Sequence, residues 1–419
     1  MSGDKILMSG KEARRLQLLG LVTEGKLTLV SAAEKLGLSY RQAKRLRQRL
    51  GRDGPRGLVH RNRGRSPANR LAPELAAQIV RLAREKYALF NDSHLTEVLA
   101  GEHGIRVGRE TVRSLLRGAG LVPKRKRKPR RHHRRRPRMP QEGLMMQWDG
   151  SPHAWFGADE PPCCLMAAMD DATSRVLALR FVTQESGAGY LWLLNRVVRR
   201  YGIPHSVYQD RHGALCRNDD WWSLEEQLAG RRDPTQVGAV LETLGIQPIR
   251  ALTPQAKGRI ERLFNTLQDR LVAELDLLGI RAIPAANRFL SNGFLSSFNR
   301  HFAVPAQRAE RAYAAVPEQL DLARAISFGY RATVRNDNTV SLGGLVIDIP
   351  PGPGRRTYAK AKVEVRQLLD GAWRIYYRDR IIARHGRTPL REPSKIKGPQ
   401  KKSLKGVRET LWIYLASKA

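Results

Sequence analysis

The sequence predicts a multidomain chain with an all-α front, an α/β centre built on a mixed five-stranded sheet, and a small β-barrel near its end. Three observations predict this. Apolar residues recur at helical spacing in residues 11–50 and 75–117, strand-like and helix-like segments alternate from residue 143, and residues 327–388 are β-rich with hairpin turns. A chain of 419 residues is also too long for one ordinary hydrophobic core.

The first helical unit, residues 1–52, has the pattern of a helix-turn-helix. Gly37 ends one helix, and Ser39 with Gln42 forms a capping box that begins the next. Apolar positions at helical spacing would be buried: Leu29, Ala32, Ala33, Leu36, Ala43, Leu46 and Leu50. The opposite face of the second helix carries side chains that suit a helix in the DNA major groove: Arg41, Gln42, Lys44, Arg45 and Arg47. A solvated basic helix in a bundle is the alternative.

A second helical unit, residues 74–120, follows a basic linker at residues 53–73. Its helices are expected over 75–86, 93–102 and 109–117. In the third helix Val112, Leu115 and Leu116 would face inward, and Arg109, Arg113 and Arg117 would line the other side. The arginine face predicts a second DNA-binding unit, and a helical spacer is the alternative.

The charge of the chain indicates a polyanionic partner. There are 75 Lys and Arg against 39 Asp and Glu, a formal net charge of +36. The strongly basic linker at residues 121–142, with Arg127 and Arg131 among its candidate DNA contacts, supplies only part of this excess. Phosphate contacts over a long footprint would explain a basicity so widely spread. Ribosome association and an anionic membrane surface are the alternatives.

The expected location is the cytoplasm. No run of about eighteen apolar residues offers a membrane span, and the first residues, MSGDKILMSGKEARRL, are charged where a signal peptide would be apolar. Cys163, Cys164 and Cys216 are too few for a disulfide framework or a four-ligand zinc site, so they are expected to be reduced core residues.

From residue 143 the order of elements is that of a ribonuclease-H-like mixed sheet. Three strands form a meander, and helices and strands then alternate. The expected strands are 143–148, 165–169, 176–182, 206–209 and 245–252, with helices over 187–201 and 255–275. An insertion is expected between residues 219 and 245.

Three acidic residues of this region form a candidate catalytic and metal site. Asp149 and Asp210 each follow a largely apolar strand, and Glu261 lies one turn into the long helix. Carboxylates at one sheet edge favour Mg²⁺, for which Mn²⁺ can substitute. Two such ions activate the attacking hydroxyl and stabilise the departing oxygen of a phosphoryl transfer. Asp170 and Asp171 are better explained by a hairpin turn.

Residues 145–275 resemble the integrase-type catalytic core of DDE transposases, especially the bacterial insertion-sequence group called ISNCY. The phrases that carry the resemblance are QWDGSPHAWF, MDDATSRV, YQDRHG and QAKGRIERLFNTLQDRLV. The resemblance places the two catalytic aspartates of that family on Asp149 and Asp210 and its glutamate on Glu261. It also implies two metal ions per site and the same order of helix-turn-helix, core and small barrel.

Further basic residues near the three carboxylates are candidate DNA contacts. Lys257 lies four residues before Glu261, so a helix would place both on one face, where pairing with Glu261 or solvation is the alternative role. The other candidates are Arg259, Arg262, His153 and His212. The two histidines are equally compatible with a structural role.

The sequence therefore predicts a transposase that binds the terminal inverted repeats of an insertion sequence, cuts the 3′ ends and transfers them to target DNA. A dimer or larger assembly on the DNA, associated with the bacterial nucleoid, is expected, with no membrane partner. The alternatives are a DNA-binding regulator with an inactive core and a structure-directed nuclease. The remaining predicted segments are the catalytic core at 143–300, a helical connector at 301–326, the barrel at 327–388 and a basic tail at 389–419.

Overall fold

The computed structural model describes residues 6–60, 62–63, 70–123, 136–217, 222–250 and 257–390. The candidate DNA contacts Arg127 and Arg131, and the tail from residue 391, lie outside these ranges. The chain divides into two compact units, Met1–Gln78 and Ile79–Ala419. Among the described residues, no helix combines the length and the apolar character that a membrane span requires.

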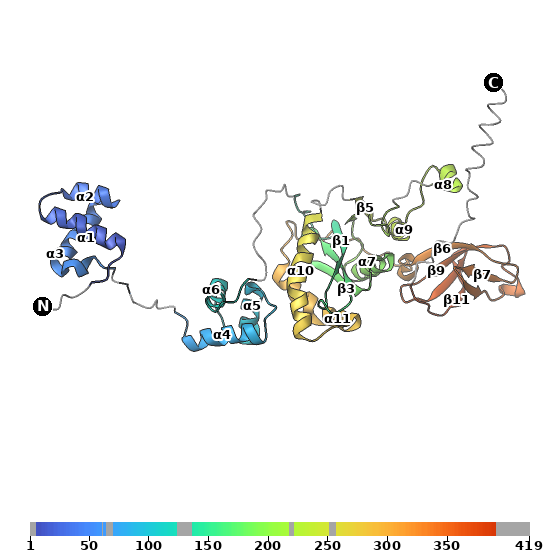
Figure 1. Ribbon diagram of the computed structural model, residues 1–419. Helices are drawn as coiled ribbons and strands as arrows, with labels where there is room; N and C mark the ends of the chain where they lie inside the picture. Colours follow the sequence, from blue (N-terminus) through green and yellow to red (C-terminus); the bar gives the residue numbers. More distant parts are fainter. Residues whose placement is uncertain are drawn as a thin grey trace, which may run out of the picture. The chain divides into compact units, whose positions relative to one another are not determined.

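The first unit contains the predicted helix-turn-helix (Figure 1). Its elements are α1 (Gly10–Thr23), α2 (Leu29–Leu36), α3 (Tyr40–Asp53) and the 3₁₀ turn η1 (Gly54–Leu58). Gly37 adopts a left-handed φ of 65°, which ends α2, and Ser39 with Gln42 forms the predicted capping box of α3. Leu19, Ala32, Ala33, Ala43 and Leu58 are buried.

Helical structure continues past residue 52, where the sequence placed the start of a linker. Buried Leu58 belongs to η1. Buried Glu12 of α1 accepts a hydrogen bond from the backbone N–H of His60 at 2.9 Å and pairs with Arg63 at 2.5 Å. These contacts bind the chain that follows α3 back onto α1, so the predicted boundary is about ten residues too early.

The second helical segment has the three predicted helices, α4 (Pro73–Glu85), α5 (Asp92–Glu102) and α6 (Arg109–Gly118). Asn91 caps α5 by accepting hydrogen bonds from the N–H groups of Ser93 and His94. The helices bury an apolar face that includes Leu95, Leu99, Val112 and Leu116.

The central sheet is mixed and five-stranded, as predicted. Its strands are β1 (Met145–His153), β2 (Cys163–Asp170), β3 (Val176–Val182), β4 (Ser206–Gln209) and β5 (Gln247–Arg250). The order is β3-β2-β1-β4-β5, with β1, β2 and β3 antiparallel and β1, β4 and β5 parallel. This is the meander followed by parallel strands that the sequence predicts.

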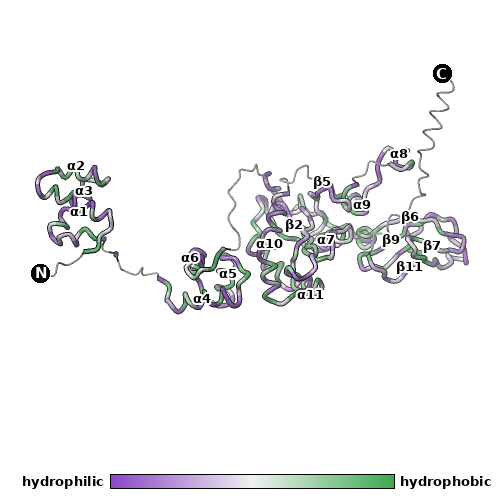
Figure 2. The backbone as a smooth tube through the Cα atoms, viewed as in Figure 1, coloured by the Kyte–Doolittle hydropathy of each residue, from purple (hydrophilic) through white to green (hydrophobic). Residues whose placement is uncertain are grey.

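Helices cover both faces of the sheet (Figure 1). One face packs against α7 (Gly187–Tyr201) and α9 (Gln236–Thr243). The other packs against α10 (Gly258–Leu277), α11 (Ile283–Phe289), the π-helical turn η3 (Leu290–Phe294) and α12 (Leu295–Phe302). Alternate residues of β2 enter the two cores, so the strand is apolar almost throughout, whereas α3 is hydrophilic (Figure 2). The three cysteines are buried and free, as predicted.

Two connecting segments differ from the expectation. The predicted insertion after residue 219 contains α8 (Leu224–Ala229) together with α9, which packs in the core. The predicted helical connector is largely without helix: Ala314 forms an isolated bridge with Ile203, and the only helix beginning within its described residues is α13 (Leu322–Ala325). Backbone pairing with the core replaces the internal hydrogen bonds of a helix in this connector.

The described C-terminal strands do not close into the predicted barrel. A four-stranded antiparallel sheet, ordered β11-β10-β9-β6, comprises β6 (Phe328–Thr333), β9 (Lys362–Gln367), β10 (Trp373–Tyr377) and β11 (Arg380–His385). The short strands β7 (Thr339–Leu342) and β8 (Leu345–Asp348) pair only with each other, and the 3₁₀ turn η4 (Pro353–Arg355) follows them. Both sheets share one apolar core, so packing of side chains takes the place of closure by hydrogen bonds.

Candidate active site

Strand register brings Asp149 and Asp210 to the same edge of the central sheet. In the parallel pair β1·β4, Met145 lies opposite Ser206 and Gln147 opposite Tyr208. Extending this register by two residues places Asp149 opposite Asp210. The two aspartates are thus separated along the chain by the same number of residues as the paired residues of β1 and β4. This equality explains why the two side chains lie next to each other.

One strand end was predicted incorrectly. The sequence ends the first strand at Asp149, but β1 continues to His153 because its other edge is paired with β2 along that whole length. Asp210 does follow the last residue of β4, as predicted. Asp149 thus projects from a strand that is anchored on one side only, where the partner strand β4 has already ended.

Lys257 joins the two aspartates. Its Nζ lies 2.9 Å from Oδ1 of Asp149 and 3.3 Å from Oδ2 of Asp210. The lysine side chain is 8% exposed, against 17% for Asp149 and 40% for Asp210. An ammonium group therefore occupies a cation position between two carboxylates, and it pairs with these rather than with Glu261.

The ionisation of Asp149 is sensitive to its surroundings. Burial raises the pKa of this carboxyl to about 6, the nearby Lys257 ammonium opposes the rise, and the charges of Asp210 and Glu185 add to it. A carboxylate with a pKa raised in this way is stabilised in its ionised form by a nearby cation. Such perturbed groups gather at functional sites.

Glu185 is a fourth carboxylate beside this pair, and the sequence analysis missed it. It lies between β3 and α7, accepts a hydrogen bond from the hydroxyl of Tyr190, and comes within 3.7 Å of Nδ1 of His212. A Cβ added at Gly150, next to Asp149, would lie 2.5 Å from Oε2 of Glu185, so a side chain there would require Glu185 to shift. The sequence TQESGAG carries no signal for this role, because the approach of Glu185 depends on the packing of α7.

The structure does not bring Glu261 into contact with the two aspartates. Glu261 is exposed in the first turn of α10, and its described hydrogen bond is from Asn265 to its backbone carbonyl. Within the described residues, no group of three Asp, Glu, His or Cys side chains surrounds a common metal position. Residues 251–256, which lead into α10, lie outside the described ranges. The catalytic role of Glu261 therefore stays a prediction.

Arg259, which the sequence analysis offers as a DNA contact, is paired with a buried carboxylate in the structure. It is 14% exposed, and its guanidinium pairs with the fully buried Asp171 at 2.6 Å and donates to the backbone carbonyl of Arg136. Asp171 also pairs with Arg136 and accepts hydrogen bonds from Gln147 and the N–H of Met139. This cluster neutralises Arg259 and connects α10 to β1 and to the chain before it. The contact of Arg259 with DNA stays a prediction.

The other candidate DNA contacts fall into two groups. Arg41, Lys44, Arg45, Arg109, Arg113 and Arg262 are exposed on helices, as predicted. Gln42 is exposed too, but its side chain accepts a hydrogen bond from Ser39 N–H in the capping box. His212 is bound into the loop after β4 through its own N–H, which donates to Asp210, and His153 packs edge-on against Trp155 at 5.4 Å.

The fold and site define a class: an α/β protein with a mixed five-stranded sheet, paired carboxylates at one sheet edge and an amino-terminal helix-turn-helix. Comparison of the sequence makes this more specific. Residues 14–67 match the model of a helix-turn-helix domain. The chain is 37% identical over 305 residues to the Sinorhizobium fredii protein called transposase y4bF, and 28% identical over 412 residues to the transposase for insertion sequence IS1202 of Streptococcus pneumoniae. The chain is therefore similar in sequence to two bacterial proteins that carry the name transposase.

The extent of these matches differs. The alignment with transposase y4bF covers 73% of this chain and 65% of the relative, less than two thirds of its length, and the alignment with the IS1202 transposase covers 88% and 85%. Among solved structures, a simian T-cell lymphotropic virus intasome in complex with the PP2A regulatory subunit B56 gamma aligns over 75% of this chain and 100% of the matched chain. Its TM-score of 0.30 and identity of 15% are too low to support the fold assignment.

Proposed function

We propose that the chain is a DDE-type transposase that cuts the 3′ ends of an insertion sequence and joins them to target DNA in a metal-dependent reaction. The observation that carries this proposal is the pairing of Asp149 and Asp210 around one cation position at the edge of the sheet. The relationship to bacterial transposases and the net charge of +36 support a DNA substrate.

The residues present fit a divalent cation. The ammonium of Lys257 is a stand-in: it shows that the two carboxylates are arranged around a positive charge. Their donor atoms are oxygens, the ligands that Mg²⁺ and Mn²⁺ prefer. Asp149 and Asp210 would hold the metal, with Glu261 as the third ligand that the family resemblance implies. Bound ions would activate the attacking hydroxyl and stabilise the departing oxygen.

Other residues position these groups. Arg259, through Asp171, fixes the first turn of the helix that carries Glu261. Glu185 adds negative charge near Asp149 and is itself oriented by Tyr190. The exposed basic face of α3 would contact the terminal inverted repeats, and the C-terminal sheets would hold flanking DNA. Because two ends must be joined in concert, a dimer or larger assembly on DNA is part of the proposal.

The test uses the full chain with Mn²⁺ or Mg²⁺ and labelled duplexes of candidate element ends. Wild type should give both nicked and joined products, whereas Asp149→Asn and Asp210→Asn should give neither above background, because one metal-holding carboxylate is lost. Asp276→Asn is the matched control, since Asp276 is an exposed residue paired with Arg281. Strand transfer by Asp149→Asn at the wild-type rate would falsify the proposal.

A DNA-binding regulator with an inactive core is the second candidate. The exposed side chain of Glu261 favours it, because Glu261 belongs to no group of three metal-ligating side chains among the described residues. A regulator would bind element ends without metal and give no products with wild type or with any variant. Loss of joined products in Glu261→Gln, with DNA binding unchanged, would exclude this candidate and support Glu261 as the third metal ligand.

A further inference from the structure

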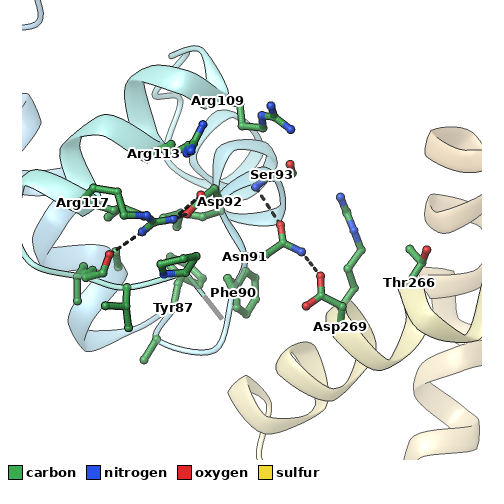
Figure 3. A pocket seen from close by; sticks show the side chains of 18 of the residues that line it. Tyr87, Phe90, Asn91, Asp92, Ser93, Arg109, Arg113, Arg117, Thr266 and Asp269 are labelled. Atoms are coloured by element: carbon green, nitrogen blue, oxygen red, sulfur yellow. Dashed lines mark hydrogen bonds and ion pairs between the residues drawn. The ribbon is translucent and has the colours of Figure 1, made fainter. Parts of the chain in front are cut away.

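A groove lies between the second helical segment and α10. It has a volume of about 850 Å³ and is lined by residues of α4, α5 and α6 on one side and of α10 on the other. Figure 3 shows Arg109 and Arg113 on the α6 side, with Thr266 and Asp269 on α10 opposite them. The groove therefore joins a predicted DNA-binding helix to the helix that carries Glu261.

Polar contacts across the interface hold the two walls together. Arg270 of α10 forms a two-pronged ion pair with Glu97 of α5, at 2.5 and 2.8 Å, and stacks on the ring of Phe302 with 4.7 Å to its centre. Asn91 donates to Asp269 (Figure 3), and His94 lies 3.2 Å from Glu274. A bidentate Arg–carboxylate pair fixes the relative orientation of the two side chains as well as their distance. The pair of Arg270 and Glu97 therefore fixes the separation of the two walls of the groove.

The lining of the groove is strongly basic. It includes two acids, Asp92 and Asp269, and six arginines: Arg84, Arg109, Arg113, Arg117, Arg262 and Arg270. Asp92 is neutralised by Arg117, with 2.6 Å between the charged atoms, and Asp269 accepts from Asn91. The groove thus has an excess of positive charge that its own acids do not balance.

Four of the six arginines are exposed, and three of these, Arg109, Arg113 and Arg262, are suited to an external anion. Arg109 and Arg113 share one exposed carboxylate, Glu110, at 2.8 and 3.1 Å, and such surface pairs contribute little. Arg109 and Arg113 lie four residues apart on α6, about 6 Å along the helix axis. The two guanidinium groups can therefore bind two phosphates of one DNA strand at the same time. Arg262 is exposed and directly follows Glu261. The other three are committed to a backbone carbonyl or to a partner acid.

We propose that this groove binds the sugar–phosphate backbone of the element-end duplex and leads it to the catalytic edge. The inference rests on the proposed function and adds the surface that connects end binding to catalysis. Guanidinium groups on both walls suit the phosphates of one strand, and a contact of this kind is independent of base sequence. Arg262 marks the point at which a strand in the groove passes beside Glu261.

The test is the salt dependence of duplex binding by the full chain in EDTA, so that catalysis plays no part. The variant Arg109→Gln/Arg113→Gln/Arg262→Gln should reduce the slope of log K against log salt by about 2 to 3, and weaken binding roughly 10- to 100-fold at about 0.1 M salt. The matching control is Arg281→Gln/Arg288→Gln/Arg308→Gln, which removes three exposed charges outside the groove and should bind within about twofold of wild type. The corresponding triple Arg→Lys groove variant should keep the wild-type slope.

The outcomes separate the two proposals. Equal slopes for the groove and control variants, with tight binding by wild type, would overturn the groove and leave the proposed function standing. Failure of wild type to bind any duplex would overturn both. A groove variant that binds weakly, while its thermal unfolding matches that of wild type and the Lys variant binds normally, supports the groove as a phosphate-binding surface.

Discussion

The candidate active site has a sheet half and a helix half, and the two are held in different ways. Asp149 and Asp210 are placed by the backbone register of β1 and β4. The helix half, with Lys257, Arg259 and Glu261, is placed by side-chain contacts with residues distant in sequence. Backbone ladders fix a position through many hydrogen bonds, whereas the first turn of α10 is held by side chains alone: the buried Ile260 and the ion pairs of Lys257 and Arg259. The helix half is therefore the part that single substitutions should displace.

The largest expected effect is at Asp171, which holds the helix half. Asp171→Ala leaves Arg136 and Arg259 partly buried without their shared carboxylate. Loss of one partner of a buried charge pair costs about 3 to 5 kcal/mol, and the partial exposure of Arg136 favours the lower figure. We expect a loss of about 3 kcal/mol in the free energy of unfolding, measured by urea denaturation, together with slower strand transfer.

Asp159→Ala is the matched control, because Asp159 is exposed in the loop between β1 and β2. It should unfold and react like wild type. If Asp171→Ala is as stable as this control, then Asp171 is only a turn residue, as the sequence first suggested, and the sheet and helix halves do not depend on the ion pairs described here.

The sequence predicts the sheet half better than the helix half for a physical reason. Strand periodicity and turn residues are local signals, so the order of the five strands and the edge position of Asp210 follow from the chain itself. The environment of Arg259 depends on Asp171, a residue 88 positions away, and no local pattern encodes that contact. The approach of Glu185 to Asp149 was missed for the same reason.

The predicted barrel shows the same limit. The turn at Asp370 and Gly371 is local, and β9 and β10 pair across it as one of the hairpins expected in residues 327–388. Whether separate hairpins join into one closed sheet depends on contacts between distant strands, which alternation of apolar residues does not specify. Here β7 and β8 stay apart from the four-stranded sheet.

A smaller effect is expected at Lys257, where the two halves meet. In Lys257→Met no ammonium occupies the cation position, so at pH 8 the protein should bind Mn²⁺ roughly tenfold more tightly, because the metal displaces no competing charge. The pKa of Asp149, about 6 in the wild-type chain, should rise in the variant since Lys257 lowers it. Metal binding should then weaken below about pH 6 in wild type but from a higher pH in the variant.

Titration of Mn²⁺ by calorimetry at several pH values measures both effects. Lys257→Arg retains a cation and should keep the wild-type profile. Unchanged affinity and an unchanged pH profile in Lys257→Met would mean that the ammonium and the metal do not compete, and that the helix half does not reach the carboxylates in solution.

The smallest effect is expected where the helix half supports the second helical segment. Glu97→Arg and Arg270→Glu each place like charges across the α5–α10 contact, and the combined swap restores opposite charges. Because Arg270 is 12% exposed and Glu97 37%, the coupling energy from the double-mutant cycle should be about 1 to 2 kcal/mol. Hydrogen exchange should quicken in α5 in each single variant and slow again in the swap.

The pair Arg281 and Asp276 provides the control for that cycle, because it lies at the end of the same helix but is 39% and 45% exposed. Its coupling energy should be below about 1 kcal/mol, with no change in α5 exchange. If the Glu97–Arg270 cycle gives a coupling as small as this control, then the second helical segment is not fixed to α10 in solution. The difference between the two cycles therefore measures how far the groove is preformed before DNA binds.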